Sequence, residues 1–231
     1  NLTAFIQFIE EKEKTNFNSY SEFYDWSVSE LEKFWEYVWI YSNIIHSTTY
    51  KKVLSEYKMP GAKWFEGATL NFAENLLRYK DSHTAIISSR ENYPTYKITY
   101  EELYKLVASV AHSLISLGVK KGDRVAGFVT NIPEAIIAML ATTSVGALWS
   151  SCSPDFGTQG VIDRFGQIEP KIIFAIQSYY YNGKHIDCIE KIEAISKNIK
   201  SLEQIIIIKE CGNLNDFSID VSPTVKLSNI I

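Results

Sequence analysis

Residues 99–129 have the sequence TYEELYKLVASVAHSLISLGVKKGDRVAGFV, which has the pattern of an amphipathic helix followed by a short apolar strand. Thr99 and Glu102 form a capping box, a typical start of a helix, and Gly118 is a typical stop. Between them, apolar side chains recur on one helical face at Leu103, Leu106, Val107, Val110, Ala111 and Leu114. The pattern predicts a helix over residues 100–117 and a strand over residues 124–129.

Similar apolar runs, rich in residues that favour strands, occur on both sides of this stretch. They predict strands at residues 84–88, 96–98, 147–151, 171–176 and 204–208. A further helix is expected to begin near Asn131 and Pro133, because proline is favoured in the first turn. Strands joined by helices of this length form βαβ units with a parallel sheet and right-handed crossovers. We therefore expect an α/β fold with a parallel-rich sheet.

The amino-terminal region, residues 1–66, is rich in aromatic residues and has a helical pattern without an alternating run typical of a strand. Ser27 and Glu30 suggest a capping box, after which Leu31, Phe34, Trp35, Val38 and Tyr41 recur at helical spacing. Residues 59–67 contain a proline and two glycines and suggest a connecting loop. We expect an amino-terminal helical region at 1–66, forming a helical cap, and an α/β domain at 67–231.

Composition and charge exclude several classes of protein. The net charge is −4 and no long basic run occurs, so a nucleic-acid partner is not expected. The three cysteines are isolated, which fits a reducing compartment and argues against a zinc site or a disulfide framework. The apolar stretch at 132–149 is interrupted by Glu134 and is too polar for a membrane span. We expect a cytoplasmic protein without a membrane partner.

The loops that follow the strands are the expected place for a ligand, because α/β sheets bind ligands beyond the carboxyl ends of their strands. Tyr181, Asn182, Gly183 and Lys184 stand immediately before a predicted helix that runs through Ile189 and Ile192. A helix start, a glycine, a cation and tyrosine faces are the components of a nucleotide-phosphate site. An ordinary strand-to-helix turn is the alternative interpretation.

No catalytic constellation is evident in the sequence. It contains neither a Walker loop nor the glycine fingerprint of dinucleotide-binding proteins, which argues against an NAD-type oxidoreductase. The four histidines lack metal-ligand spacing, and the serines near residue 151 lack the frame of a nucleophile elbow. We therefore predict no catalytic residue and no metal ligand.

Several motifs, in order and spacing, resemble the adenylate-forming enzyme superfamily. Residues 98–103 resemble its first core motif and are followed by 117–125 and 131–135. Residues 64–75 look like the amino-terminal signature of the acetyl-CoA synthetase branch. Within that branch, residues 146–157 and 163–171 resemble the acetoacetyl-CoA synthetases. The resemblance extends from about residue 20 to about residue 210.

This resemblance implies a two-step ligase that joins acetoacetate to CoA. Acetoacetate and ATP would give an acyl-adenylate and pyrophosphate, with magnesium offsetting phosphate charge, and CoA would then displace AMP. In related enzymes the segment matching Tyr181–Lys184 contacts the nucleotide end of CoA, with arginines at its first and last positions. Ser153, Pro154 and Asp155 correspond, less closely, to a stretch beside the CoA adenine. Another short-chain acid, such as acetate, is the alternative substrate.

The resemblance also implies that the phosphate loop, the acyl pocket and the catalytic lysine lie beyond the position of Ile231. Since the chain starts at Asn1 without a methionine, we expect an amino-terminal fragment that is inactive without its own carboxy-terminal segments. The alternative is a free-standing, non-catalytic module that binds the CoA nucleotide or a partner.

Overall fold

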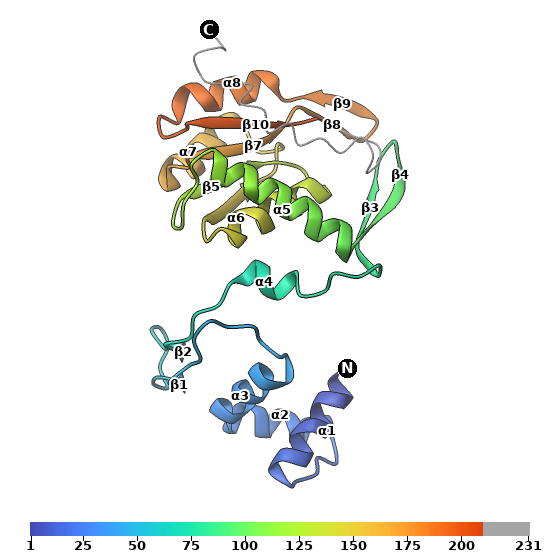
Figure 1. Ribbon diagram of the computed structural model, residues 1–231, viewed down its shortest axis with the longest axis vertical. Coiled ribbons are helices and arrows are strands. Elements are labelled where there is room, and N and C mark those ends of the chain that lie inside the picture. Colours follow the sequence, from blue (N-terminus) through green and yellow to red (C-terminus); the bar gives the residue numbers. More distant parts are fainter. Residues whose placement is uncertain (210–231) are drawn as a thin grey trace. The chain divides into compact units, whose positions relative to one another are not determined.

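The chain folds into two compact units in the computed structural model, which describes residues 1–209 (Figure 1). The first unit comprises Asn1–Asn71 and the second begins at Phe72. The domain boundary that the sequence suggests, between residues 66 and 67, stays a prediction.

The first unit contains three helices and one pair of short strands within residues 1–71. They are α1 (Leu2–Glu13), α2 (Tyr20–Ser29), α3 (Leu31–Tyr41), β1 (Lys52–Leu54) and β2 (Trp64–Glu66). The strands pair antiparallel, with Lys52 opposite Glu66 and Leu54 opposite Trp64. The expectation that residues 1–66 contain no strand is therefore wrong. These strands are three residues each, too short to show an alternating pattern.

The predicted capping box at Ser27 and Glu30 is also wrong. Ser27 lies in the last turn of α2, where its hydroxyl donates to the carbonyl of Tyr24 at 2.7 Å. Helix α2 is instead capped by Ser19, whose hydroxyl accepts from the amide of Glu22 at 3.2 Å. Helix α3 nevertheless covers the expected region, beginning at Leu31.

Within residues 72–209, the elements of the second unit are α4 (Phe72–Leu76), β3 (Thr84–Arg90), β4 (Tyr93–Thr99), α5 (Tyr100–Ser116), β5 (Arg124–Phe128), α6 (Pro133–Ser144), β6 (Leu148–Cys152), α7 (Thr158–Ile168), β7 (Ile172–Ile176), β8 (Ser178–Tyr181), β9 (Lys184–Asp187), α8 (Ile189–Asn198) and β10 (Gln204–Ile208). Strands and helices alternate from β4 to β7, as expected, while β3–β4 and β7–β9 are consecutive strands. Four of the strands form a parallel sheet in the order β10-β7-β5-β6. The α/β fold with a parallel sheet is confirmed.

Strands β3 and β4 do not belong to that sheet. They pair with each other in an antiparallel hairpin, with Ile86 opposite Ile98. Only Glu91 and Asn92 separate them, and a parallel crossover needs a dozen or more residues. The sequence suggested that the parallel sheet begins at residue 84. The sheet instead begins at β5.

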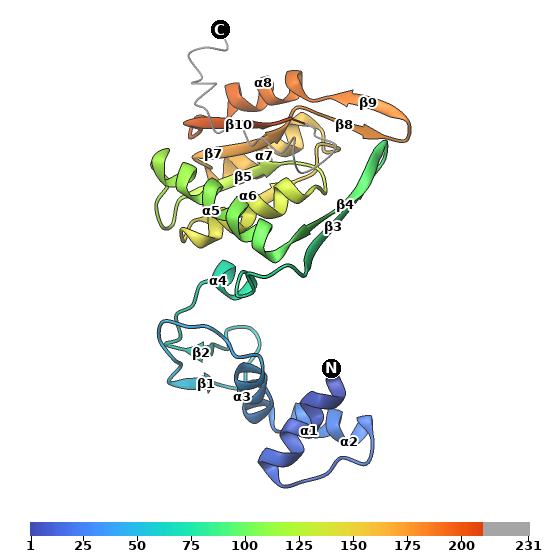
Figure 2. The same cartoon turned by 45° about the vertical axis from the view of Figure 1, so that its right-hand side comes forward.

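Helices cover both faces of the parallel sheet. Helix α5 packs against α6 on one side and α7 packs against α8 on the other, as the two views of the ribbon show (Figures 1 and 2). The predicted start of α5 is confirmed, because the hydroxyl of Thr99 accepts from the amide of Glu102 at 3.2 Å. The Glu102 carboxylate in turn accepts from the amide of Thr99 at 2.8 Å.

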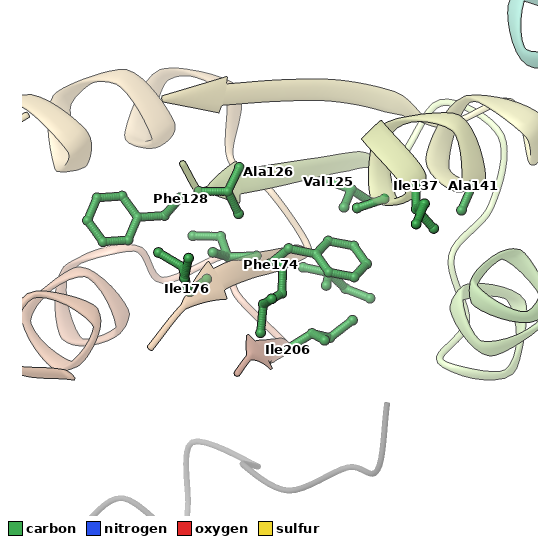
Figure 3. Packing of buried hydrophobic residues seen from close by; sticks show 14 of the residues in the cluster. Val125, Ala126, Phe128, Ile137, Ala141, Phe174, Ile176 and Ile206 are labelled. Carbon is green, nitrogen blue, oxygen red and sulfur yellow. The ribbon is translucent and has the colours of Figure 1, made fainter. Parts of the chain in front are cut away.

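The core lies between the sheet and these helices (Figure 3). All five residues of β7 are buried, as expected for a central parallel strand with both faces covered. Phe128 and Phe174 project from neighbouring strands into this core, and Ile137 reaches it from α6. Within residues 1–209, no helix is both long and apolar enough to cross a bilayer.

Candidate functional site

The order of the strands creates a crevice at the carboxyl ends of β5 and β7. These strands are neighbours, but β5 continues through α6 to β6, whereas β7 continues through the β8–β9 hairpin and α8 to β10. The two connections therefore run to opposite sides of the sheet. Such a topological switch point is the preferred ligand site of open α/β sheets.

A cavity of about 240 Å³ lies at this position. Its lining comes from the turn between β3 and β4, the loop after β5, and strand β8: Arg90, Glu91, Thr130, Asn131, Ile132, Tyr179, Tyr180 and Tyr181. The guanidinium of Arg90 lies over the ring of Tyr93, with 4.6 Å from its central carbon to the ring centroid. The cavity thus combines aromatic faces, a cation and an amide side chain.

Tyr181, Asn182, Gly183 and Lys184 form the tip of the β8–β9 hairpin. Tyr181 pairs with Lys184, while Asn182 and Gly183 have φ angles of 50° and 74°. Two consecutive positive φ angles define a type I′ turn, for which Asn-Gly is the preferred sequence. The tip is exposed to solvent, so the side chain of Lys184 is accessible to an anion.

The predicted position of these residues at a helix start is wrong. Helix α8 begins at Ile189, and strand β9 separates it from the hairpin tip. The amide of Ile189 donates to the carboxylate of Asp187 at 2.7 Å, so a side chain already serves that helix end. The α8 dipole is therefore no argument for phosphate binding at Lys184, and only the side chains and amides of the tip remain.

The loop after β6 brings Ser153, Pro154 and Asp155 close to the base of the same hairpin. Tyr179 of β8 donates its hydroxyl hydrogen bond to Asp155 Oδ1 at 2.7 Å. The Ser153 hydroxyl donates to Asp155 Oδ2, also at 2.7 Å. From α8, Lys191 Nζ donates to the carbonyl of Pro154 at 2.9 Å. The two predicted segments therefore share one connected region of the second unit.

Hydrogen bonding and burial shift the pKa values of Asp155 and Tyr179 in opposite directions. The hydrogen bond from Tyr179, followed by that from Ser153, lowers the pKa of Asp155. Burial, and then the bond to Asp155, raises the pKa of Tyr179. Any stability from the ionised Asp155 is complete above the ordinary carboxyl pKa and is lost as the pH falls through the lowered value.

The hairpin tip also contacts the β3–β4 turn. The amide of Gly183 donates to the carboxylate of Glu91. The rings of Tyr93 and Tyr180 meet edge to face, with 6.4 Å between centroids. The ends of these hairpins lie side by side in both ribbon views (Figures 1 and 2). An anion at the tip would therefore be bound by Lys184, because a carboxylate already occupies the Gly183 amide.

Two cysteines near this region are buried and free. Burial raises the pKa of the Cys152 thiol to about 11 and also raises the pKa of the Cys188 thiol. A thiol that stays protonated is a poor nucleophile, so neither is a candidate for covalent chemistry. Cys211 lies outside the described residues. Across residues 1–209, no cluster of His, Cys, Asp and Glu is suited to hold a metal ion.

Sequence reasoning missed Tyr179, Lys191 and Glu91. Tyr179 contacts Asp155, which lies 24 positions away in the sequence, and Glu91 contacts Gly183, which lies 92 positions away. No local pattern could pair residues at such separations. The hairpin itself did have a signal, since Asn-Gly between strand-forming residues is a strong indicator of a two-residue turn.

Comparison with known proteins identifies the family. The model of AMP-binding enzymes matches residues 72–224, and the model of the acetyl-coenzyme A synthetase N-terminus matches residues 20–76. The acetoacetyl-coenzyme A synthetase of Rhizobium meliloti is 42% identical over 225 residues, covering 97% of this chain and 34% of the relative. That of Gallus gallus is 41% identical over 209 residues, covering 89% of this chain and 31% of the relative.

A solved structure gives the same result for the fold. The acetoacetyl-CoA synthetase from Streptomyces lividans superposes with a TM-score of 0.86 at 39% identity, covering 91% of this chain and 33% of that one. This chain thus spans about a third of the length of these relatives. The resemblance to acetoacetyl-CoA synthetases is confirmed, and since one family model matches more than half of its residues, the chain belongs to the AMP-binding enzymes.

Proposed function

We propose that the protein containing this chain is an acid–thiol ligase that makes acetoacetyl-CoA from acetoacetate, ATP and CoA. The observation that carries this proposal is the 42% identity to an acetoacetyl-coenzyme A synthetase over 97% of the chain. In the first step the carboxylate would attack the α-phosphate of ATP and release pyrophosphate. In the second, the CoA thiol would attack the acyl carbon, lose its proton and release AMP.

The contribution of this chain would be to bind the nucleotide end of CoA. Tyr181, Asn182, Gly183 and Lys184 offer an exposed cation on a two-residue turn, and Ser153, Pro154 and Asp155 are linked to the same hairpin through Tyr179. Lys184 would meet a phosphate as a point charge. Where related enzymes have an arginine at the first position, Tyr181 offers a ring for stacking on the adenine but no bidentate contact.

The chemistry of the first step is assigned to residues outside this sequence. Magnesium would offset the negative charge of the ATP phosphates, but the described residues offer no group that could hold it. We also propose a cytoplasmic location, which is consistent with the two free cysteines among residues 1–209.

The experiment is to assay the whole protein that contains this chain with acetoacetate and with acetate. Acetoacetate-dependent exchange between ATP and pyrophosphate, followed by CoA-dependent AMP formation, is the expected result. If kcat/KM is higher for acetate than for acetoacetate, acetate is the substrate and the acetoacetate assignment is wrong.

If neither acid supports exchange, the ligase assignment is wrong. A non-catalytic module would then remain, and CoA binding without turnover would identify it as a CoA-nucleotide module. The absence of CoA binding would favour a partner-binding role.

A further inference from the structure

We infer that Tyr179 is a positioning residue for CoA: its hydroxyl fixes the Ser153–Asp155 loop against the hairpin in the arrangement that the CoA nucleotide needs. This inference rests on the proposed function. We call the hydrogen bond between Tyr179 and Asp155, with the bond from Ser153, the Tyr179 clamp. Tyr179 is not itself expected to touch a reacting atom.

The clamp holds the Asp155 carboxylate through both of its oxygens. Tyr179 donates to Oδ1 and Ser153 donates to Oδ2, each at 2.7 Å. The Asp155 amide returns a hydrogen bond to the Ser153 hydroxyl at 3.2 Å, which closes the loop on itself. Hydrogen bonds to an ionised carboxylate are among the stronger ones in proteins, so this loop has one preferred shape.

Tyr179, the residue that holds the loop, is itself buried. Tyr179 has 6% of its surface exposed and belongs to the buried core cluster of the second unit. It stands in β8, opposite Ile186 and two residues before Tyr181, at the hairpin tip. The position of the loop is therefore tied to the strand that carries the predicted CoA contacts.

A second contact ties the loop to the same connection. Lys191 of α8 donates to the Pro154 carbonyl at 2.9 Å. Strands β8 and β9 and helix α8 together form the connection from β7 to β10, so loop and hairpin are held by one continuous segment. Removing the Tyr179 hydroxyl would leave the Lys191 contact and the tyrosine-sized ring in place, so the loop would loosen without unfolding.

The expected effect follows from the population of the binding arrangement. When only a fraction of the protein is competent to bind, the apparent Kd is the intrinsic Kd divided by that fraction. If loss of the clamp lowers the competent fraction to about a tenth, the Kd for CoA rises about tenfold. A residue that only stabilises the fold would instead lower the unfolding temperature and affect both half-reactions alike.

The experiment measures, in the whole protein, the Kd of 3′,5′-ADP, the nucleotide end of CoA, and the KM for CoA. Tyr179→Phe should raise both about tenfold and leave ATP–pyrophosphate exchange near the parent rate. Asp155→Asn keeps an acceptor for the tyrosine hydroxyl, so its effect should be smaller than that of Asp155→Ala. The double variant Tyr179→Phe and Asp155→Ala should bind 3′,5′-ADP no more weakly than Asp155→Ala alone, because both substitutions remove the same hydrogen bond.

Tyr50→Phe is the matched control. Tyr50 also donates its hydroxyl to a carboxylate, that of Glu36 at 2.8 Å, but it belongs to the first unit. It should lower stability without changing the affinity for 3′,5′-ADP. An equal loss of affinity in Tyr50→Phe and Tyr179→Phe would reduce the clamp to a general stabilising contact.

The failure of this inference and of the proposed function are distinguishable through Lys184→Ala. If Lys184→Ala weakens binding of 3′,5′-ADP but Tyr179→Phe does not, the CoA site stands and the positioning role is wrong. If the parent protein binds neither 3′,5′-ADP nor CoA, the proposed function fails and the positioning role fails with it.

Discussion

Lys184 is the cation at the hairpin tip, and its replacement tests CoA binding most directly. Lys184→Ala should raise the KM for CoA by about threefold if the phosphate contact is exposed and by about thirtyfold if it is well formed. The first half-reaction uses no CoA, so acetoacetate-dependent ATP–pyrophosphate exchange should stay near the parent rate. Both quantities are measured on the same preparation.

The control is Lys200→Ala, which removes the same charge from an exposed position before β10, at the amino end of the sheet. It should leave the KM for CoA unchanged. An equal increase in KM for both variants would indicate general electrostatics. No increase for Lys184→Ala would remove Lys184 from the binding site.

Gly127 of β5 is a residue at which the close approach of a neighbour requires glycine. A Cβ atom there would lie 2.6 Å from the Trp149 ring, which in turn packs against Phe174 with 6.0 Å between ring centroids. Gly127→Ala should therefore overpack the sheet face and lower the free energy of unfolding by about 1–3 kcal/mol. Denaturant unfolding of the protein measures the effect.

Gly166 provides the opposite case for the same substitution. It lies inside α7, and a Cβ atom there would meet nothing within 4 Å. Gly166→Ala should raise stability by up to about 1 kcal/mol, because alanine is the better helix former. If both variants destabilise equally, contact with Trp149 is not the reason that position 127 is glycine.

The β8–β9 hairpin carries the candidate site, and its turn depends on residues that adopt positive φ. Gly183 has a φ angle of 74°, so Gly183→Ala should cost about 1–2 kcal/mol and distort the tip. We expect a higher KM for CoA with normal ATP–pyrophosphate exchange. Gly122→Ala is the matched control, since Gly122 has a φ angle of 88°, free space around it, and a position before β5. If it raises the KM for CoA equally, the effect is not specific to the tip.

The elements that the sequence predicted well are those whose determinants are local. Helix α5 has a capping box and one apolar face, and β7 and β10 are nearly continuous apolar runs, so each was found within about a residue. The capping box predicted at Ser27 was wrong because spacing alone does not fix the hydrogen-bond partner. Ser27 has the right spacing to Glu30, but its hydroxyl donates to Tyr24 within α2. The prediction that the parallel sheet begins at residue 84 was wrong because the composition of a strand does not specify its partner strand.

The candidate site was predictable in part for the same reason. Tyr181–Lys184 were identified from their residue types and position as well as from family motifs, and Ser153–Asp155 from family motifs; their role in CoA binding stays a prediction. The contact between the two segments depends on Tyr179 and on a parallel sheet that places their loops at one edge. Such a contact is a property of the folded unit, so local spacing in the sequence could not reveal it.

At the level of the whole chain, the assignment of chemistry to other segments gives a prediction for the 231 residues alone. The switch-point crevice lies in the second unit, but the described residues contain no metal-binding cluster, and the sequence has no Walker phosphate loop. We expect this chain by itself to form no AMP from ATP, acetoacetate and CoA, because residues 1–209 offer no cluster that could hold a metal ion to stabilise charge on the α-phosphate. The assay compares it with the whole protein under the same conditions, and circular dichroism of the same sample verifies that the chain is folded. Turnover by the folded chain at a rate comparable to that of the whole protein would show that the residues performing the chemistry lie within these 231 positions.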